Sequence, residues 1–158
     1  MQGDENVITF LNDQLTAELT AINQYFIHAR MQENWGLTRL ASYTQGESID
    51  EMKHAQTLID RILFLEGVPN LQRLNRLRVG QTVAEQFEAD MAVEVEAVDR
   101  LREGVAYMRS VGDITSANIF EAILADEESH IDYLETQIDL LARMGEAVYI
   151  NYASESPS

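Results

Sequence analysis

One polar constellation occurs twice in this chain with the same spacing, and it constrains the fold more than any other feature. The two copies are Glu18 followed by Glu51-x-x-His54, and Glu94 followed by Glu127-x-x-His130. In each copy 33 positions separate the single Glu from its motif, and the copies are offset by 76 residues. Residues three apart on an α-helix share a face. Each Glu and His pair can therefore meet one ion, and the repeat predicts a pseudo-twofold arrangement.

These polar residues occupy positions where a helical core needs hydrophobic side chains. Four stripes with helical periodicity contain them: Ile8, Leu11, Leu15, Glu18, Ile22 and Tyr25; Leu40, Glu47, Glu51, His54, Leu58, Ile62 and Leu65; Phe87, Met91, Glu94, Val98, Leu101 and Val105; Phe120, Ile123, Glu127, His130, Leu134, Ile138 and Leu141. Uncompensated buried carboxylates are costly, which disfavours a metal-free hydrogen-bonded network. Two divalent ions would neutralise four carboxylates, and mixed Glu and His ligands suit iron or manganese, with zinc less specific.

Composition limits the classes of protein to which the chain can belong. Its 158 residues fit one domain with a single core. A formal net charge of -16 disfavours binding to nucleic acid or to an anionic membrane surface and favours cations as partners. The chain has no Cys and therefore no disulfide or thiolate chemistry. Residues 1–10 lack the features of a secretory signal and no stretch is apolar enough to span a membrane, so a cytoplasmic location is expected.

Capping and turn residues predict the bounds of the first two helices. Asp4 is the expected N-cap of a first helix that runs to about residue 34, where a short break follows. Thr38 is expected to cap the second helix, which should end near Glu66. Gly67 is then expected to adopt the left-handed conformation that commonly follows a helix.

The second half of the chain contains the remaining elements. They are a long connection over residues 67–81, a third helix opened by the capping box Thr82-x-x-Glu85, a Gly112-Asp113 turn, a fourth helix from about Ile114 to about Gly145, and a short fifth helix over residues 147–152. Short, long and short connections predict an all-α four-helix bundle with one long crossover and a short C-terminal fifth helix. We expect one domain over residues 1–153 and a disordered tail over 154–158.

The two Glu and Glu-x-x-His sets resemble the ligand pattern of the ferritin-like di-iron carboxylate family. A narrower similarity, to the bacterioferritins, covers nearly the whole chain. The segments that carry it are Met1-Gln2-Gly3-Asp4, Asn23-Gln24-Tyr25-Phe26, Asn34-Trp35-Gly36-Leu37, Glu47-Ser48-Ile49-Asp50-Glu51-Met52-Lys53-His54-Ala55, Arg61-Ile62-Leu63-Phe64-Leu65-Glu66-Gly67 and Asp126-Glu127-Glu128-Ser129-His130-Ile131-Asp132. A lone Glu-x-x-His is a weak signal, whereas the paired set at equal spacing is strong.

The resemblance to bacterioferritins implies an assembly and its cofactors. It implies a hollow homo-oligomeric shell of 24 subunits built from dimers, holding ferric mineral, with a ferroxidase di-iron centre inside each chain and haem b shared between two chains. Carried onto this sequence, the assignments are Glu51 and Glu127 bridging the two iron ions, Glu18 with His54 at one metal position, Glu94 with His130 at the other, and Tyr25 as a hydrogen-bonding or redox neighbour.

Met52 is the candidate haem ligand. On an ideal helix it points about 130° away from the mean direction of Glu51 and His54, so it faces outward. The resemblance implies that a methionine from each of two chains binds the haem iron, which fits the isologous contact of a dimer. Residues expected to flank the haem are Leu19, Ile22, Asn23, Phe26, Ile49 and Lys53. Gly46 departs from the family, because some haem-bearing members have a histidine there that binds an inner-wall iron beside the equivalent of Asp50.

Three further predictions concern the surface. Related shells line ion-entry pores at four positions of this chain, with a solvated acidic face as the alternative: Asn34, Glu66, Asp132 and Asp139. Residues 68–71 offer apolar groups to a partner, or pack as an ordinary loop. His28 is off the Glu18 face by about 80°, so it is expected at the surface or in an interface.

The resulting hypothesis is an iron-storage ferroxidase. Fe²⁺ would be oxidised to Fe³⁺ by O₂ or H₂O₂, and the iron would pass to a mineral core or remain as a cofactor. Haem would carry electrons inward from a small ferredoxin for iron release. One alternative is a di-iron or di-manganese oxidase or oxygenase, which needs a substrate cavity beside the metals, and another is a non-catalytic haem-binding helical scaffold. The absence of Cys disfavours a rubrerythrin-type peroxidase.

Overall fold

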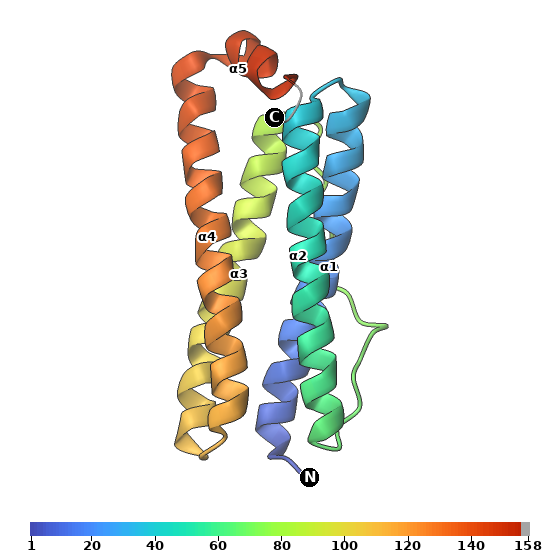
Figure 1. Cartoon of the computed structure of the whole chain (residues 1–158), viewed down its shortest axis with the longest axis vertical. Coiled ribbons are helices and arrows are strands. Elements are labelled where there is room, and N and C mark those ends of the chain that lie inside the picture. Colours follow the sequence, from blue (N-terminus) through green and yellow to red (C-terminus); the bar gives the residue numbers. More distant parts are fainter. Residues whose placement is uncertain (156–158) are drawn as a thin grey trace.

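The computed structural model describes residues 1–155, which form helices and, within that range, no strand. The helices are α1 (Glu5–Asn34), α2 (Thr38–Phe64), α3 (Val83–Ser110), α4 (Ile114–Met144) and α5 (Glu146–Ala153). Figure 1 shows α1 beside α2 in one half of the bundle, α3 beside α4 in the other, and α5 across one end. The predicted all-α bundle with a short C-terminal fifth helix is confirmed. Residues 156–158 of the expected tail lie outside the described residues.

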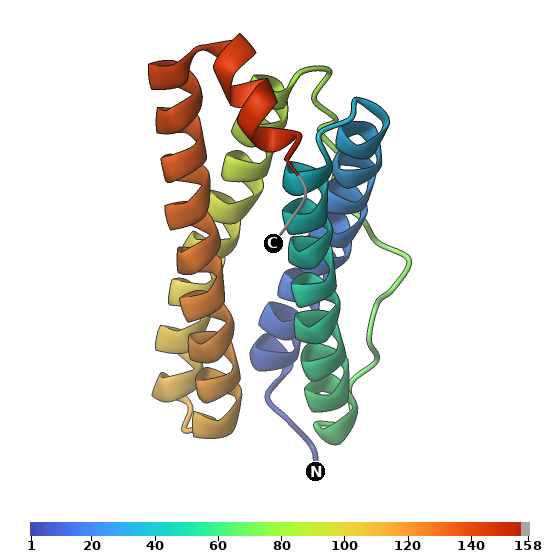
Figure 2. The same cartoon turned by 45° about the horizontal axis from the view of Figure 1, so that its top comes forward.

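The connections determine how the two halves are assembled. The pairs α1 and α2, and α3 and α4, pack as antiparallel hairpins, and α1 also packs on α3. Residues 65–82 run along the outside of the bundle, so α3 begins at the same end of the molecule as α2 (Figures 1 and 2). This segment is the predicted long crossover. Among the helices of residues 1–155, none combines the length and hydrophobicity that crossing a membrane requires.

Side-chain caps begin three of the helices. Asp4 accepts hydrogen bonds from the backbone N–H groups of Asn6 and Val7 at the start of α1, as predicted. Thr82 Oγ1 accepts from the Glu85 N–H at the start of α3. The Glu85 carboxylate accepts from the Gln81 N–H rather than from that of Thr82, so only half of the expected capping box forms.

Two predictions about α2 are wrong. The N-cap is Leu37, which has no side-chain cap, and Thr38 is the first helical residue, with its hydroxyl donating to the Ser154 carbonyl. At the other end α2 stops at Phe64, and Glu66 rather than Gly67 has the positive φ, 63°. Packing explains why residue 67 is a glycine, because a Cβ at this position would lie 2.9 Å from Ile8 Cγ2.

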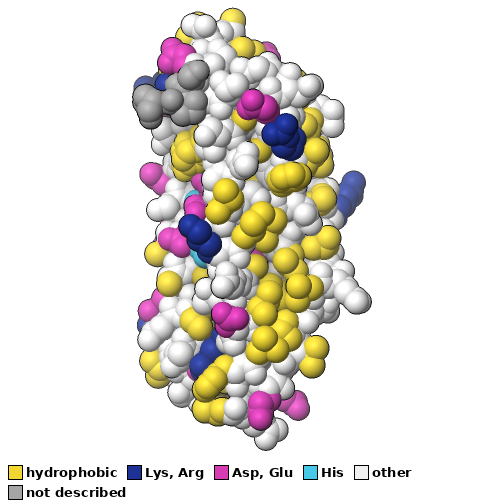
Figure 3. Space-filling view, turned by 45° about the vertical axis from the view of Figure 1, so that its right-hand side comes forward, with side chains coloured by type: hydrophobic (Ala, Val, Ile, Leu, Met, Phe, Trp, Pro, Cys, Tyr) yellow, Lys and Arg dark blue, Asp and Glu magenta, His cyan; other side chains and the backbone are white. Residues whose placement is uncertain are grey.

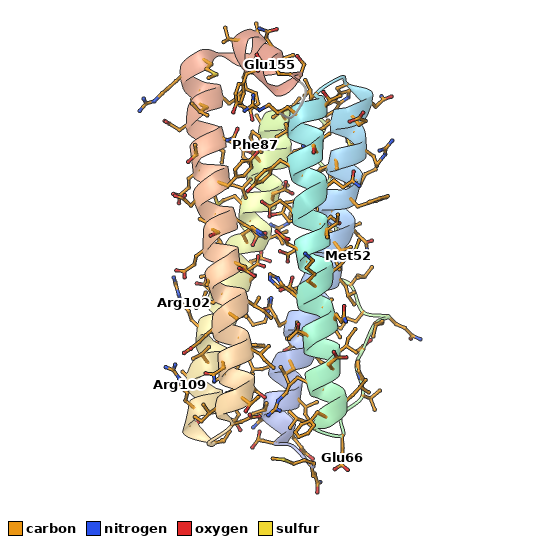
Figure 4. All side chains as sticks on the ribbon, in the orientation of Figure 1. Met52, Glu66, Phe87, Arg102, Arg109 and Glu155 are labelled. Atoms are coloured by element: carbon orange, nitrogen blue, oxygen red, sulfur yellow. The ribbon has the colours of Figure 1, made fainter. Side chains whose placement is uncertain are left out.

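The hydrophobic core is divided into two clusters. The larger contains Val7, Leu11, Leu15, Ala55, Leu58, Ile62, Leu65, Leu101, Val105, Met108, Ala117, Phe120 and Ile123. The smaller, under α5, contains Leu37, Leu40, Phe87 (labelled in Figure 4), Leu134, Tyr149 and Ala153. The polar stripe positions lie between these clusters along all four long helices. A layer of buried polar side chains therefore crosses the middle of the bundle.

Side chains of α1 hold the crossover through its backbone N–H groups. The four hydrogen bonds, which we call the α1 ladder, join Asn12 Oδ1 to Asn70 N (2.9 Å), Thr20 Oγ1 to Asn75 N (2.9 Å), Gln24 Oε1 to Arg78 N (3.1 Å) and His28 Nε2 to Gly80 N (3.0 Å). The acceptors lie four or eight residues apart, on one face of α1. The ladder orders a segment that has no helix or strand of its own.

His28 is fully buried, so the prediction that it lies at the surface or in an interface is wrong. Its Nε2 accepts from the Gly80 N–H, which places the ring proton on Nδ1. Nδ1 lies 3.0 Å from Asp90 Oδ1 and donates to it. The face of α1 beside the Glu18 stripe is covered by α3 and the crossover rather than by solvent.

Candidate metal centre

Four helices bring the six predicted metal ligands into the polar layer of the bundle. Glu18 comes from α1, Glu51 and His54 from α2, Glu94 from α3, and Glu127 and His130 from α4. None of these residues is more than 7% exposed. Each occupies a position of its helical stripe, so the spacing that packs leucines elsewhere aims carboxylates and imidazoles at one point.

The ligand atoms form two overlapping groups. The first consists of Glu18, Glu51, His54 and Glu127, and the second of Glu51, Glu94, Glu127 and His130. Within each group one ligand atom per residue lies within 4.8 Å of all the others, a spacing that suits one metal ion. Glu51 and Glu127 belong to both groups. This is the arrangement that two ions bridged by two carboxylates require.

Each of the six residues has one buried atom that lacks a hydrogen-bond partner. These atoms are Glu18 Oε2, Glu51 Oε1, His54 Nδ1, Glu94 Oε2, Glu127 Oε1 and His130 Nδ1. His54 Nδ1 lies 3.1 Å from Glu127 Oε1 and His130 Nδ1 lies 3.2 Å from Glu51 Oε1, but without the geometry of a hydrogen bond. Buried polar atoms are normally paired. Four unpaired carboxylate oxygens and two unpaired imidazole nitrogens, all buried together, are ligand atoms that suit a pair of divalent ions.

Carboxylates behind the two imidazoles fix their orientation. His54 Nε2 lies 2.7 Å from Asp126 Oδ2, and His130 Nε2 lies 2.5 Å from Glu47 Oε2 and 3.6 Å from Asp50 Oδ2. A carboxylate on one ring nitrogen holds the other nitrogen, here Nδ1, towards a metal. Glu47, Asp50 and His130 form a third group that could hold an ion, although Gly46 contributes no ligand.

Asp126 and Glu47 were not predicted as site residues. The repeat contains a signal for Asp126, because the 76-residue offset makes it equivalent to Asp50. Glu47 lies on the expected α2 stripe, but it has no counterpart in the second copy, where Ile123 occupies the equivalent position. The internal repeat therefore predicted the six side chains that meet in the bundle better than it predicted their neighbours.

Tyr25 lies against the centre, as the resemblance implied. It is buried, and its hydroxyl donates to Glu94 Oε1 at 2.5 Å. Burial raises the pKa of Tyr25 well above its usual value, and the nearby charge of Glu94 raises it further. The phenol therefore keeps its proton and its hydrogen bond to the ligand. Its redox role remains a prediction.

The carboxyl groups of the centre have pKa values that shift in different directions. Burial, together with the neighbouring Glu18, raises the pKa of Glu51. Burial and the contact with Glu127 raise the pKa of Glu94 in the same way. Burial also raises the pKa of Glu127, but its contacts with Glu94 and His130 outweigh burial, and the net shift is well downward. These shifts favour the protonated forms of Glu51 and Glu94 and the ionised form of Glu127.

Both imidazoles become more basic in this setting. Burial lowers the pKa of His54, but its contacts with Glu127, Glu18 and Glu51 outweigh burial and raise the pKa above its usual value. Burial also lowers the pKa of His130, but the surrounding glutamates, of which Glu127 has the largest effect, raise it above its usual value. The raised pKa values favour the protonated form of both imidazoles among these carboxylates.

The predicted haem face lies on the opposite side of α2. Met52 (labelled in Figure 4) is 47% exposed, and the predicted haem neighbours Phe26 and Ile49 are also exposed. The remaining predicted neighbours are exposed (Asn23 and Lys53) or half-buried (Leu19 and Ile22). Figure 3 shows hydrophobic side chains gathered in a band down this face. An exposed thioether within an apolar surface fits a haem covered by a partner chain.

The four predicted pore residues are all exposed, and they lie at different levels of the molecule. Asn34 ends α1 at the upper end in Figure 1, whereas Glu66 lies at the lower end, as Figure 4 shows. Asp132 and Asp139 lie on α4, where Asp139 pairs with Arg143 at 3.0 Å. A pore formed by these residues would need neighbouring chains, so the assignment remains a prediction. In residues 68–71, Val68 is 81% exposed.

Comparison with known proteins places this bundle and its site in a family. The ferritin-like domain model of the ferritin family matches residues 8–144. A bacterioferritin from Streptomyces coelicolor is 64% identical over 155 residues, covering 98% of this chain and 93% of that protein. Bacterioferritin BfrA from Mycobacterium tuberculosis is 57% identical over 149 residues, 94% of each chain. A solved structure of M. tuberculosis BfrA superposes with a TM-score of 0.97 at 55% identity and covers 98% of both chains. The chain belongs to the ferritin family, among its bacterioferritins.

Proposed function

We propose that this chain stores iron and oxidises Fe²⁺ to Fe³⁺ at the two-metal centre. The observation that carries the proposal is the set of six unpaired, buried ligand atoms in two groups that share Glu51 and Glu127. In this proposal Glu18 and His54 bind one Fe²⁺, and Glu94 and His130 bind the other. O₂ or H₂O₂ accepts the electrons. The similarity to bacterioferritins supports iron as the metal.

The assembly belongs to the same proposal. We propose a homo-oligomeric shell of 24 subunits in the cytoplasm, with acidic residues such as Asp132 attracting Fe²⁺ towards its pores. The exposed apolar band on α1 and α2 supports a stable contact with a second copy of the chain. A mineral core inside the shell would receive the Fe³⁺.

We propose that haem b binds between two such faces. Met52 from each of two chains would hold the haem iron through its thioether, with Phe26 and Ile49 among the apolar neighbours. When bound, the haem supplies one-electron transfer, and two thioether ligands favour its reduced form. The residues around it exclude water and hold the thioethers outward. A small ferredoxin is the proposed reductant for iron release.

One observation disfavours an oxidase or oxygenase that acts on an organic substrate. A cavity of about 340 Å³ lies between α2, α4 and α5, lined by residues that include Tyr43, Tyr133 and Tyr152. None of the six ligands lines it. A substrate in that cavity would therefore not contact the metals.

Anaerobic addition of Fe²⁺ to size-fractionated protein, followed by air, tests the proposal. We expect a shell-sized species that rapidly oxidises many more irons than it has metal positions. Oxidation that stops at about two irons per chain would indicate a stable di-iron cofactor. No oxidation would indicate a haem-binding scaffold, and protein found only as monomers or dimers would exclude storage.

A further inference from the structure

The two single glutamates of the centre are equivalent in the repeat but have different hydrogen-bond partners. Gln14 Nε2 donates to Glu18 Oε1 at 2.9 Å, whereas Tyr25 donates to Glu94 Oε1. Gln14 is 0% exposed. Glu18 Oε2 has no hydrogen-bond partner and lies 3.6 Å from His54 Nδ1. The protein therefore holds one oxygen of Glu18 and leaves the other facing a metal position.

Arg100 fixes the orientation of the Gln14 amide. Its NH1 donates to Gln14 Oε1 at 3.4 Å. A guanidinium can only donate, so it selects the orientation in which the amide oxygen faces Arg100 and the amide nitrogen faces Glu18. The positive charge also strengthens the hydrogen bond. Arg100 on α3 thus acts on a ligand of α1 through one intervening side chain.

The other half of the repeat contains a pair of residues equivalent to Gln14 and Arg100, but this pair makes no hydrogen bond to Glu94. The 76-residue offset makes Asp90 equivalent to Gln14, and Gln24 equivalent to Arg100. These residues also pair, with Gln24 Nε2 donating to Asp90 Oδ1 at 2.8 Å. Asp90 Oδ1 also accepts from His28. Asp90 accepts both of these hydrogen bonds, and neither Asp90 nor Gln24 donates to Glu94. Only one of the two metal positions therefore has an oriented amide behind its glutamate.

We infer that Gln14, oriented by Arg100, is a positioning residue that restricts Glu18 to one metal-binding oxygen and pre-organises the position formed by Glu18 and His54. The inference rests on the two-metal centre proposed above. Glu94 is held instead by the Tyr25 phenol, so the two positions have different donors behind their glutamates and bind a divalent ion with different affinities. Loss of an outer partner of a metal ligand typically weakens metal binding by about 10- to 100-fold.

Anaerobic titration of the metal-free protein with Co²⁺, followed by visible absorption, measures this difference. We expect two binding steps in the unsubstituted protein. Gln14→Leu removes the amide donor at similar volume and should weaken one step by about 10- to 100-fold, with a changed Co²⁺ absorption band, while the other step is unchanged. Arg100→Met, at a half-buried position, should weaken the same step by a smaller factor. This second variant keeps the test available if Gln14→Leu does not fold.

Gln32→Leu is the matched control. Gln32 is another buried glutamine of α1, and its Nε2 donates to Gln86 Oε1 at 2.9 Å, outside the metal centre. The control loses a comparable buried hydrogen bond and should leave both Co²⁺ steps and both absorption bands unchanged.

A double-mutant cycle assigns the weakened step to one half of the centre. In a His130→Ala background, which disables the other half, Gln14→Leu should still weaken Co²⁺ binding. In a His54→Ala background it should have no further effect.

Four results would overturn the inference: two equal steps in the unsubstituted protein, unchanged binding in both Gln14→Leu and Arg100→Met, equal weakening of both steps, or the same effect from Gln32→Leu. A protein that binds no Co²⁺ would instead overturn the metal centre itself.

Discussion

Metal loading should release protons from this protein. At pH 7 the raised pKa values of His54 and His130 keep both imidazoles protonated. The raised pKa values of Glu51 and Glu94 favour the neutral forms of these two carboxyls. Metal ligation requires neutral imidazoles and ionised carboxylates. Binding of two ions should therefore release about one imidazole proton for each ion, together with any proton held by Glu51 or Glu94.

These protons make both the metal affinity and the free energy of unfolding depend on pH. Because protons compete with the metal, affinity rises with pH, by up to about 100-fold per pH unit for each ion when two protons are displaced. The folded metal-free chain binds more protons than the unfolded chain above the ordinary histidine pKa of 6.5. Its free energy of unfolding should therefore fall as pH rises above that value.

Titration of weakly buffered, metal-free protein with Zn²⁺ at pH 7, with a pH indicator, counts the released protons. Glu127→Ala is the control, because it removes a ligand shared by both positions and should release far fewer. Release of fewer than about one proton per chain at saturation, or an affinity independent of pH, would refute the reasoning. Either result would mean that the empty centre is not held together by protonated imidazoles and neutral carboxyls.

Four further predictions address the centre, the shell and the packing. Glu127→Ala should abolish fast Fe²⁺ oxidation while circular dichroism shows a folded bundle, and a normal oxidation rate would show that the assigned site is wrong. Asp132→Asn should slow Fe²⁺ uptake, an effect that high salt should mimic, and an unchanged uptake rate would remove the pore assignment. Met52→Leu should abolish the low-spin haem spectrum and slow reductive iron release without altering Fe²⁺ oxidation; retention of one normal haem per pair of chains would place the ligand elsewhere. Gly104→Ala should destabilise the fold by about 1–3 kcal/mol in denaturation experiments, because the new Cβ would overlap the Phe120 ring. Gly46→Ala, with nothing within 4 Å of the new Cβ, should stabilise the fold by about 0.5–1 kcal/mol.

The six candidate metal ligands stand out in the sequence because they violate a local pattern, and the structure brings them together. A carboxylate such as Glu94 on an apolar helical stripe is visible within a few turns of chain, and its partner in the repeat confirms the reading. Helix starts were also predictable where a capping side chain lies next to the backbone N–H groups that donate to it, as at Asp4. Such signals need no knowledge of the tertiary structure.

The wrong predictions depended on contacts between distant parts of the chain. An angle on the α1 helix does not say what covers that face, and His28 is covered by Asp90 and Gly80, more than 50 positions away. Gly67 was expected to be needed for a left-handed backbone conformation, but it is needed because Ile8 of α1 leaves no room for a Cβ at position 67. Gln14 was not predicted as a site residue, because its role appears only when Arg100 of α3 is placed beside it.

The α1 ladder gives the crossover a register, although the segment is classed as a loop. From Gln24 to His28 the helix rises about 6 Å. The residues whose N–H groups donate to these side chains, Arg78 and Gly80, are two positions apart, and two extended residues reach only about 7 Å. A residue inserted between Arg78 and Gly80 would move the Gly80 N–H out of line with His28, whereas residues 71–74 carry no rung of the ladder. Length variation in this family of folds should therefore be accommodated before Asn75 and excluded between Arg78 and Gly80.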